Sequence, residues 1–129
     1  MNLASYFKNN HKELPKLSEA FIKLSKGKSL NGSPVFDLWL FENGHVIYHG
    51  IDNVEKIGTY NGSIPLETIE KLKACLSNIR PEDIGEAKGR DKALSILKTP
   101  NKKIVFQASK TKRSLYEINK VLEYIAENM

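Results

Sequence analysis

Apolar residues alternate with polar ones in the first half of the chain and recur every three or four positions in much of the second half. Alternation is typical of half-buried strands, and a 3.6-residue period is typical of amphipathic helices. The pattern predicts strands within residues 19–27, 34–42, 45–51, 54–60 and 102–108, helices over 66–79 and from about 111 onward, and a weaker helix over 2–12. Because the strands come first and the helices later, the sequence predicts an α+β fold with a mostly antiparallel sheet and helices packed on it. The expected order along the chain is a meander of about four strands, a helix, a further strand and a last helix.

Turn-forming residues set several boundaries. The Asn-Gly pair that begins at Asn61 is expected to close the fourth strand, because Asn-Gly favours a tight turn. Pro81 is expected to stop the first long helix, since proline has no N–H for the helical ladder. Residues 81–101 then form a loop with one short element, and Ser114 and Glu117 have capping-box spacing at the start of the last helix.

Residues 34–51 predict a hairpin around Asn43 and Gly44, and its register decides which side chains face the core. A two-residue type I′ turn would place Trp39 opposite Tyr48 and leave both faces apolar. A three-residue loop with Gly44 as the bulge residue shifts the register by one and exchanges the side-chain sets. We favour this second register because it gives one coherent core face, made of Phe36, Leu38, Leu40, Val46 and Tyr48. The outer face then holds Val35, Asp37, Trp39, Phe41, His45, Ile47 and His49.

This outer face is the first candidate site. Tryptophan and phenylalanine are residue types that anchor interfaces, and an apolar patch rimmed by polar groups often marks one. We therefore predict a non-enzymatic protein-binding surface, for a partner or for self-association, formed by Asp37, Trp39, Phe41, His45 and His49. The alternative is that the N-terminal segment or the last helix covers these residues as a second core layer, so the sequence leaves the exposure of Trp39 open.

Catalysis and metal binding have weaker support at this hairpin. His45 and His49 are four residues apart on a strand, about 13 Å at about 3.3 Å per residue, which is too far for one ion. Asp37 and His49 could form a general base, yet no nucleophile has a recognisable spacing, and Cys75 adjoins an apolar helix stripe as a small core residue. The glycines at 85 and 89 match no phosphate-binding pattern. We expect no metal and no cofactor, and an enzyme of unknown reaction ranks third.

Composition bounds the class of protein. The 129 residues suit a single domain, 1–129, and the apolar share of 40% suits a globular chain. No stretch is long and apolar enough to span a bilayer, and the first residues lack the apolar core of a secretory signal. Cys75 is the only cysteine, which fits a reducing compartment. We expect a cytoplasmic protein if residue 1 is the native start.

A basic stretch gives the alternative function. The net charge is +5, and residues 92–116 contain no acidic residue. Such a cluster could neutralise phosphates, with an affinity that falls steeply as salt rises. The nucleic-acid-binding residues would be Lys98, Lys102, Lys103, Lys110, Lys112 and Arg113. Lysines beside an edge strand also prevent edge-to-edge aggregation, which is the competing explanation.

The stretches SLNGSPVFDLWLFENGHVIYHG, NVEKIGTYNGSI and LETIEKLKACLSNI carry a resemblance to a known family. Over about residues 20–80 the chain resembles a bacterial domain family of unknown function, number 6438. The matching positions are Pro34, Phe36, Leu38, Leu40, Gly44, Val46, Tyr48 and Gly50. Ser29 and Ser33 stand where that family tends to have cysteines, and losing a potential disulfide fits a cytoplasmic member. The resemblance implies no reaction.

Overall fold

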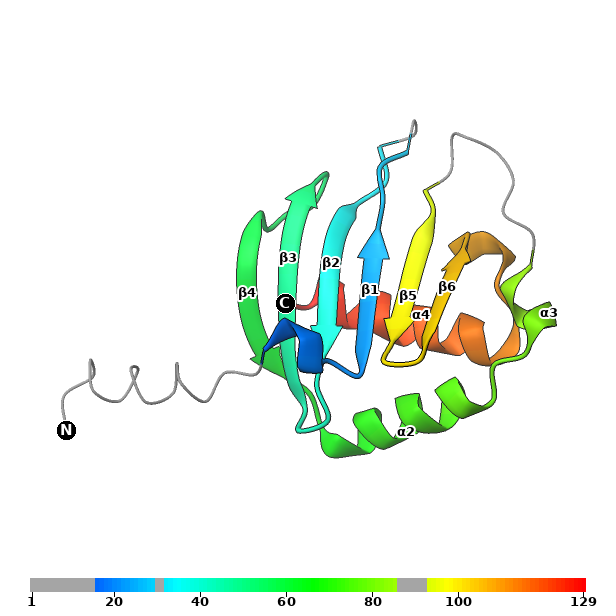
Figure 1. Ribbon diagram of the computed structural model, residues 1–129. Coiled ribbons are helices and arrows are strands. Elements are labelled where there is room, and N and C mark those ends of the chain that lie inside the picture. Colours follow the sequence, from blue (N-terminus) through cyan, green and yellow to red (C-terminus); the bar gives the residue numbers. More distant parts are fainter. Residues whose placement is uncertain (1–15, 30–31, 86–92) are drawn as a thin grey trace.

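The computed structural model describes residues 16–29, 32–85 and 93–129. Within these ranges the strands form one six-stranded antiparallel sheet, in the order β4-β3-β2-β1-β5-β6 (Figure 1). The strands are β1 (Ile22–Lys26), β2 (Val35–Leu40), β3 (His45–Asp52), β4 (Gly58–Ser63), β5 (Ser95–Thr99) and β6 (Lys102–Phe106). The α+β class predicted from the sequence is confirmed.

The long helices cover one face of this sheet, which we call the inner face. In Figure 1, α4 runs behind the sheet and α2 lies along its lower end. The helical elements are η1 (Leu17–Glu19), α2 (Leu66–Ser77), α3 (Pro81–Ile84), η2 (Ala108–Lys110) and α4 (Arg113–Glu127). The core lies between sheet and helices, where Leu24, Leu38 and Leu97 of the strands meet Leu72, Leu115, Ile118 and Leu122 of the helices. Within the described ranges, no helix combines the length and apolarity needed to cross a membrane.

The β2–β3 hairpin has the register with the three-residue loop. Leu38 lies opposite Tyr48, and Trp39 lies opposite Ile47. Gly44 has a φ of 90°, which favours glycine, and a Cβ there would lie 2.6 Å from the carbonyl oxygen of Ile64. The favoured register is therefore confirmed, and the face opposite the helices, the outer face, carries Asp37, Trp39, His45, Ile47 and His49 of the predicted set.

The fourth strand is later than predicted. Asn61 and its following glycine lie inside β4, opposite Ile47 and Val46, so they do not close the strand. Residues 53–57 instead form a bend that folds back over β3. This approach requires Gly50, because a Cβ there would clash with the carbonyl oxygen of Lys56. The alternating pattern of 54–60 misled the prediction because Val54 packs against the core from a bend.

Other boundaries also differ from the prediction. Helix α2 ends at Ser77, and Pro81 begins α3, where its missing N–H costs nothing. Residues 81–101 contain both α3 and β5. Ser114 lies inside α4, whose N-cap is Lys112, so the expected capping box does not form. The predicted helix over 2–12 lies outside the described residues.

Candidate functional site

The outer face brings Trp39 of the predicted hairpin site into one row with Lys98 and Lys103, two of the six predicted nucleic-acid-binding residues. Directly opposed residues on neighbouring strands point to the same face of a sheet. One row across the outer face therefore runs through Asn61, Ile47, Trp39, Lys23, Lys98 and Lys103. The hairpin and the β5–β6 lysines were separate in the sequence, and the insertion of β1 between them makes them neighbours.

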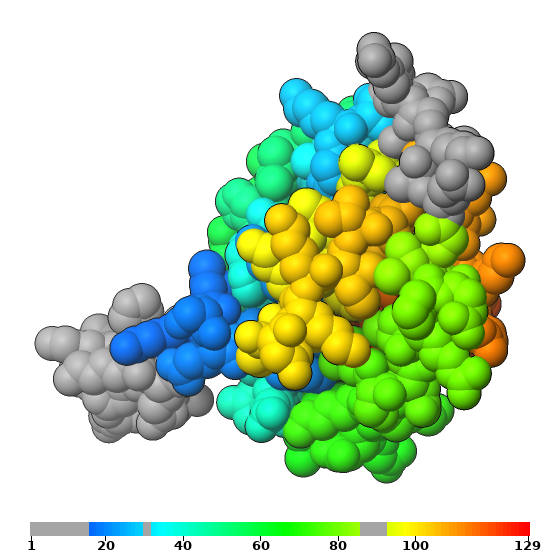
Figure 2. Space-filling model, turned by 45° about the vertical axis from the view of Figure 1, so that its right-hand side comes forward, coloured from blue at the N-terminus to red at the C-terminus, as the bar shows by residue number. Residues whose placement is uncertain are grey.

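Trp39 is the centre of this row. Its side chain is half-buried, and the ammonium of Lys23 lies 5.2 Å from its ring centroid, a cation–π contact. Beside it is a shallow hollow of about 360 Å³ between η1 and the turn that joins β5 to β6. Figure 2 shows the blue residues around η1 next to the yellow turn. Leu17 and Ser18 of η1 line this hollow, so η1 lies beside the outer face at Trp39.

The other hairpin candidates have different surroundings. Asp37 lies opposite His49, as the general-base hypothesis requires, but the Nδ1 of His49 is 2.9 Å from the hydroxyl of Thr59. His45 places Nε2 2.9 Å from the Oδ1 of Asn61. Both imidazoles therefore have a polar neighbour on β4.

Phe41 does not contribute a free ring to this surface. It is 3% exposed and meets the His45 ring edge-on, with 5.9 Å between centroids. The sequence placed Phe41 in the binding surface, and its burial instead matches the alternative of a covered side chain. The backbone N–H of Phe41 donates to the carbonyl oxygen of His45, and the carbonyl oxygen of Phe41 accepts from the N–H of Gly44, so Phe41 stands at the base of the three-residue loop.

Among the described residues, no three His, Cys, Asp or Glu side chains gather as metal ligands. Cys75 is half-buried against the core on α2. The row that holds Asp37 and His49 ends at Thr59, whose hydroxyl lies 2.9 Å from the imidazole of His49. No hydrogen bond joins Asp37 to His49 within the described ranges, so Thr59, His49 and Asp37 do not form a hydrogen-bonded triad.

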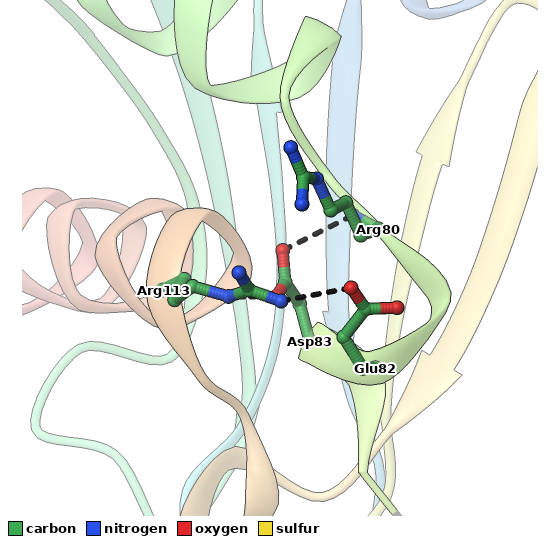
Figure 3. A network of polar contacts seen from close by, with 4 residues as sticks. All are labelled: Arg80, Glu82, Asp83 and Arg113. Carbon is green, nitrogen blue, oxygen red and sulfur yellow. Dashed lines mark hydrogen bonds and ion pairs between the residues drawn. The ribbon is translucent and has the colours of Figure 1, made fainter.

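The six basic candidates do not form one patch. Lys98 and Lys103 share the outer row, whereas Lys102 pairs with Thr99 at the end of the β5–β6 hairpin, and Lys110 and Lys112 lie at and just after η2. Arg113 points into two carboxylates, as Figure 3 shows. Its Nε donates to Asp83 and its Nη2 donates to Glu82, each at 2.9 Å. These bonds raise the pKa of Arg113, first through Asp83, and commit its side chain to joining α3 and α4.

A second site, which the sequence analysis missed, lies at the far end of the inner face. It is a cleft of about 650 Å³ between the sheet and the last turns of α4. Such volumes are typical of small-molecule sites, about 300–1,000 Å³. Its lining includes Lys26 of β1, Phe36 of β2, Tyr48 of β3, the bend at 53–56, Gln107–Ser109, and Glu123 and Ala126 of α4.

Lys26 is the charged group buried in this cleft. It is 8% exposed, with its ammonium 2.6 Å from the carboxylate of Glu123 and 3.2 Å from the Oδ1 of Asn119. The ring centroid of Phe106 lies 5.9 Å from the same ammonium. The sequence did carry a signal: Lys26 continues the inward positions of Ile22 and Leu24, so a polar residue stood where the alternation requires an apolar one.

These observations define an α+β domain whose open antiparallel sheet has helices on one face, a mixed aromatic and cationic surface on the other, and a cleft at one end. The chain belongs to the family described as a domain of unknown function (DUF6438), whose sequence profile matches residues 20–128. The match confirms the resemblance and extends it over the second half of the chain. A search of curated proteins finds no match.

One local contact joins Ser29 and Ser33, the two positions for which the resemblance implies cysteines. The backbone N–H of Ser33 donates to the hydroxyl of Ser29 at 3.3 Å. The two positions are therefore neighbours in space. No activity follows from membership, so the function has to be inferred from the surfaces.

Proposed function

We propose that this protein is a non-catalytic binding domain that holds a partner polypeptide against the outer face of its sheet, with Trp39 at the centre of the contact. The observation that carries the proposal is the placement of Trp39 in one row with Ile47 and Lys23, on the face opposite α2 and α4. Tryptophan combines a large contact area with a polar N–H, which is why it dominates the energetics of many interfaces.

The charges on this face favour an acidic partner. Lys23, Lys98 and Lys103 follow Trp39 along the row, and Lys98 and Lys103 are exposed. Asp37, with its half-buried side chain, stands in the next row. A segment with apolar and acidic side chains would match this order, with the apolar group on Trp39 and the acids over β5 and β6. Rim charges of this kind act mainly on the rate of association and on specificity.

Single-stranded nucleic acid is the second candidate, because Lys98 and Lys103 lie in the same row as an aromatic ring. Bases stack on aromatic side chains while lysines follow the phosphates. Trp39 is the only aromatic ring in that row, and Arg113 is held by carboxylates. These two facts favour the polypeptide.

The test is a selection of random displayed peptides on the immobilised protein. We expect the enriched peptides to combine acidic and apolar residues and to lose binding by about thirtyfold or more in Trp39→Ala, since an interface anchor contributes about 2 kcal/mol or more. Tyr124→Ala is the matched control, because Tyr124 is an aromatic residue of α4 that is 66% exposed. Fluorescence polarisation with the selected peptides measures the affinities.

Two results would overturn the proposal. One is a set of peptides that binds Trp39→Ala and Tyr124→Ala equally well, which would place their site elsewhere. The other is tight binding of a labelled oligothymidylate that falls by orders of magnitude between about 50 and 200 mM salt, with no peptide selected. That second result would establish the nucleic-acid alternative.

A further inference from the structure

We propose that the inner-face cleft binds an amphiphilic carboxylic acid, whose carboxylate pairs with the buried ammonium of Lys26 and whose apolar body lies along Phe36 and Tyr48. This site is on the opposite face of the sheet from Trp39, so it is independent of the polypeptide-binding surface. The cleft is about 650 Å³, which is ample for a medium-chain acid.

The burial of the charged side chains in the cleft favours an anionic ligand. Among the described residues that line the cleft, Glu55, Lys56 and Glu127 are exposed, so water and salt screen them. The ammonium of Lys26 is buried, where screening is weak and an unpaired charge is costly. The strongest requirement inside the cleft is therefore for a negative group beside Lys26.

When no ligand is bound, Glu123 supplies this negative group. Its position at the surface allows its side chain to break the ion pair with Lys26 and turn to solvent. Its side chain is 38% exposed, whereas that of Lys26 is 8% exposed and is also held by Asn119. A ligand carboxylate can take the place of Glu123 while the glutamate turns to water. The ammonium has three N–H donors, and Glu123 and Asn119 account for two within the described residues.

The rest of the lining suits an apolar body. The rings of Phe36 and Tyr48 lie with centroids 5.7 Å apart, and Val54, Ala126 and Met129 complete an apolar wall. Burial, and then the neighbouring Tyr60, raises the pKa of Tyr48, so its phenol stays neutral and adds no negative charge to the cleft. The hydroxyl of Tyr48 points to the carbonyl oxygen of Lys56, 3.4 Å away.

The test uses three probes with the same tail and different heads: octanoate, 1-octanol and octyltrimethylammonium. Titration calorimetry gives the affinities, and amide NMR shifts locate the site. We expect octanoate to bind most tightly of the three. The shifts should gather on residues of the cleft, such as Phe36 and Ala126, and leave the indole N–H of Trp39 unchanged.

Substitutions on β1 then separate the two faces. Lys26→Met should weaken octanoate by at least about tenfold, the value of one charge-assisted hydrogen bond, and leave 1-octanol within about twofold. Lys23→Met is the matched control, because it makes the same change on the same strand on the opposite face. Glu123→Gln should tighten octanoate, since it removes the competing charge.

Several outcomes would overturn the proposal. Octanoate that fails to bind at millimolar concentration, or that binds no better than 1-octanol, would show that the ammonium does not select an acid. If octyltrimethylammonium bound more tightly than octanoate, the carboxylates of the protein that line the cleft would be the groups that recognise the ligand head. If Lys26→Met does not fold, Glu123→Gln still decides, because weaker octanoate binding in that variant would exclude the exchange at Lys26.

Discussion

Two lysines of β1 show how differently the two faces of the sheet hold a charge. Lys23 faces outward, half-buried, with its ammonium over the ring of Trp39. Lys26 faces inward, 8% exposed, and is paired with Glu123 and Asn119. A charge on the outer face is screened by solvent and available to a large partner. The inner charge needs a fixed counter-group, so it favours a small ligand that can supply one.

The two faces also differ in what they do with adjacent apolar residues of β2, and this difference predicts the largest change in the free energy of unfolding. Leu38 is fully buried under the helices, and the next residue, Trp39, is on the outer face. Leu38→Ala should lower the free energy of unfolding by about 3 kcal/mol, because it leaves a cavity in the core. Trp39→Ala should cost under about 1 kcal/mol. Urea unfolding followed by circular dichroism measures both, since the second variant has no tryptophan to follow.

Equal losses in the two variants would contradict the comparison. They would mean that Trp39 belongs to a second core layer, which was the alternative left open by the sequence. The binding proposal would then move from Trp39 to the exposed lysines of β5 and β6. A clear difference would show that the outer face is free to take a partner.

The hairpin could be predicted from the sequence because its information is local. Alternation fixes which side chains share a face, and Gly44 decides the loop. The strand β5 could not be read in the same way because its apolar run is short, and its pairing with β1 joins residues about 70 positions apart. The row that joins Trp39 to Lys98 therefore emerged only from the pairing of distant strands.

The cleft could not be predicted because three segments that are far apart in the sequence have to fold back to the same end of the sheet to form it. The bend at 53–57 closes over Gly50, the segment after β6 turns at Gln107, and α4 brings Glu123 back to β1. Each of these has a weak local pattern. The one readable signal was the inward position of Lys26, which indicates a buried charge but not its partner or the space beside it.

Helix α3 offers the same contrast between a buried and an exposed charge, with a smaller expected effect. Asp83 is 1% exposed and accepts hydrogen bonds from the backbone N–H of Arg80 at 3.0 Å and from Nε of Arg113 at 2.9 Å (Figure 3). Asp83→Ala should lower the free energy of unfolding by about 2–3 kcal/mol, because it leaves both donors without their acceptor. Arg113 also has a φ of 50°, a strained conformation that these bonds help to hold.

Glu82→Ala is the control for this prediction, because Glu82 binds the same guanidinium from an exposed position. It should shift the urea midpoint far less than Asp83→Ala. Similar shifts in the two variants would show that the charge of Arg113, and not the buried acceptor, stabilises the junction of α3 and α4.

The smallest expected effect is the pH dependence that Glu82 adds. Its pKa lies below the ordinary value of 4.5, first because a backbone N–H donates to its carboxylate and second because Arg113 does. A carboxyl group whose pKa is lowered by folding stabilises the folded state above its unfolded pKa, and that contribution disappears as pH falls through the folded pKa. The wild-type protein should therefore lose slightly more stability than Glu82→Gln as pH falls from about 5 to about 3. Because Glu82 is exposed, added salt should reduce the difference between the two proteins. Urea midpoints of both proteins, measured at both pH values with and without salt, test this prediction. If the midpoints of the two proteins change in parallel with pH, the contact of Glu82 with Arg113 does not stabilise the fold in solution.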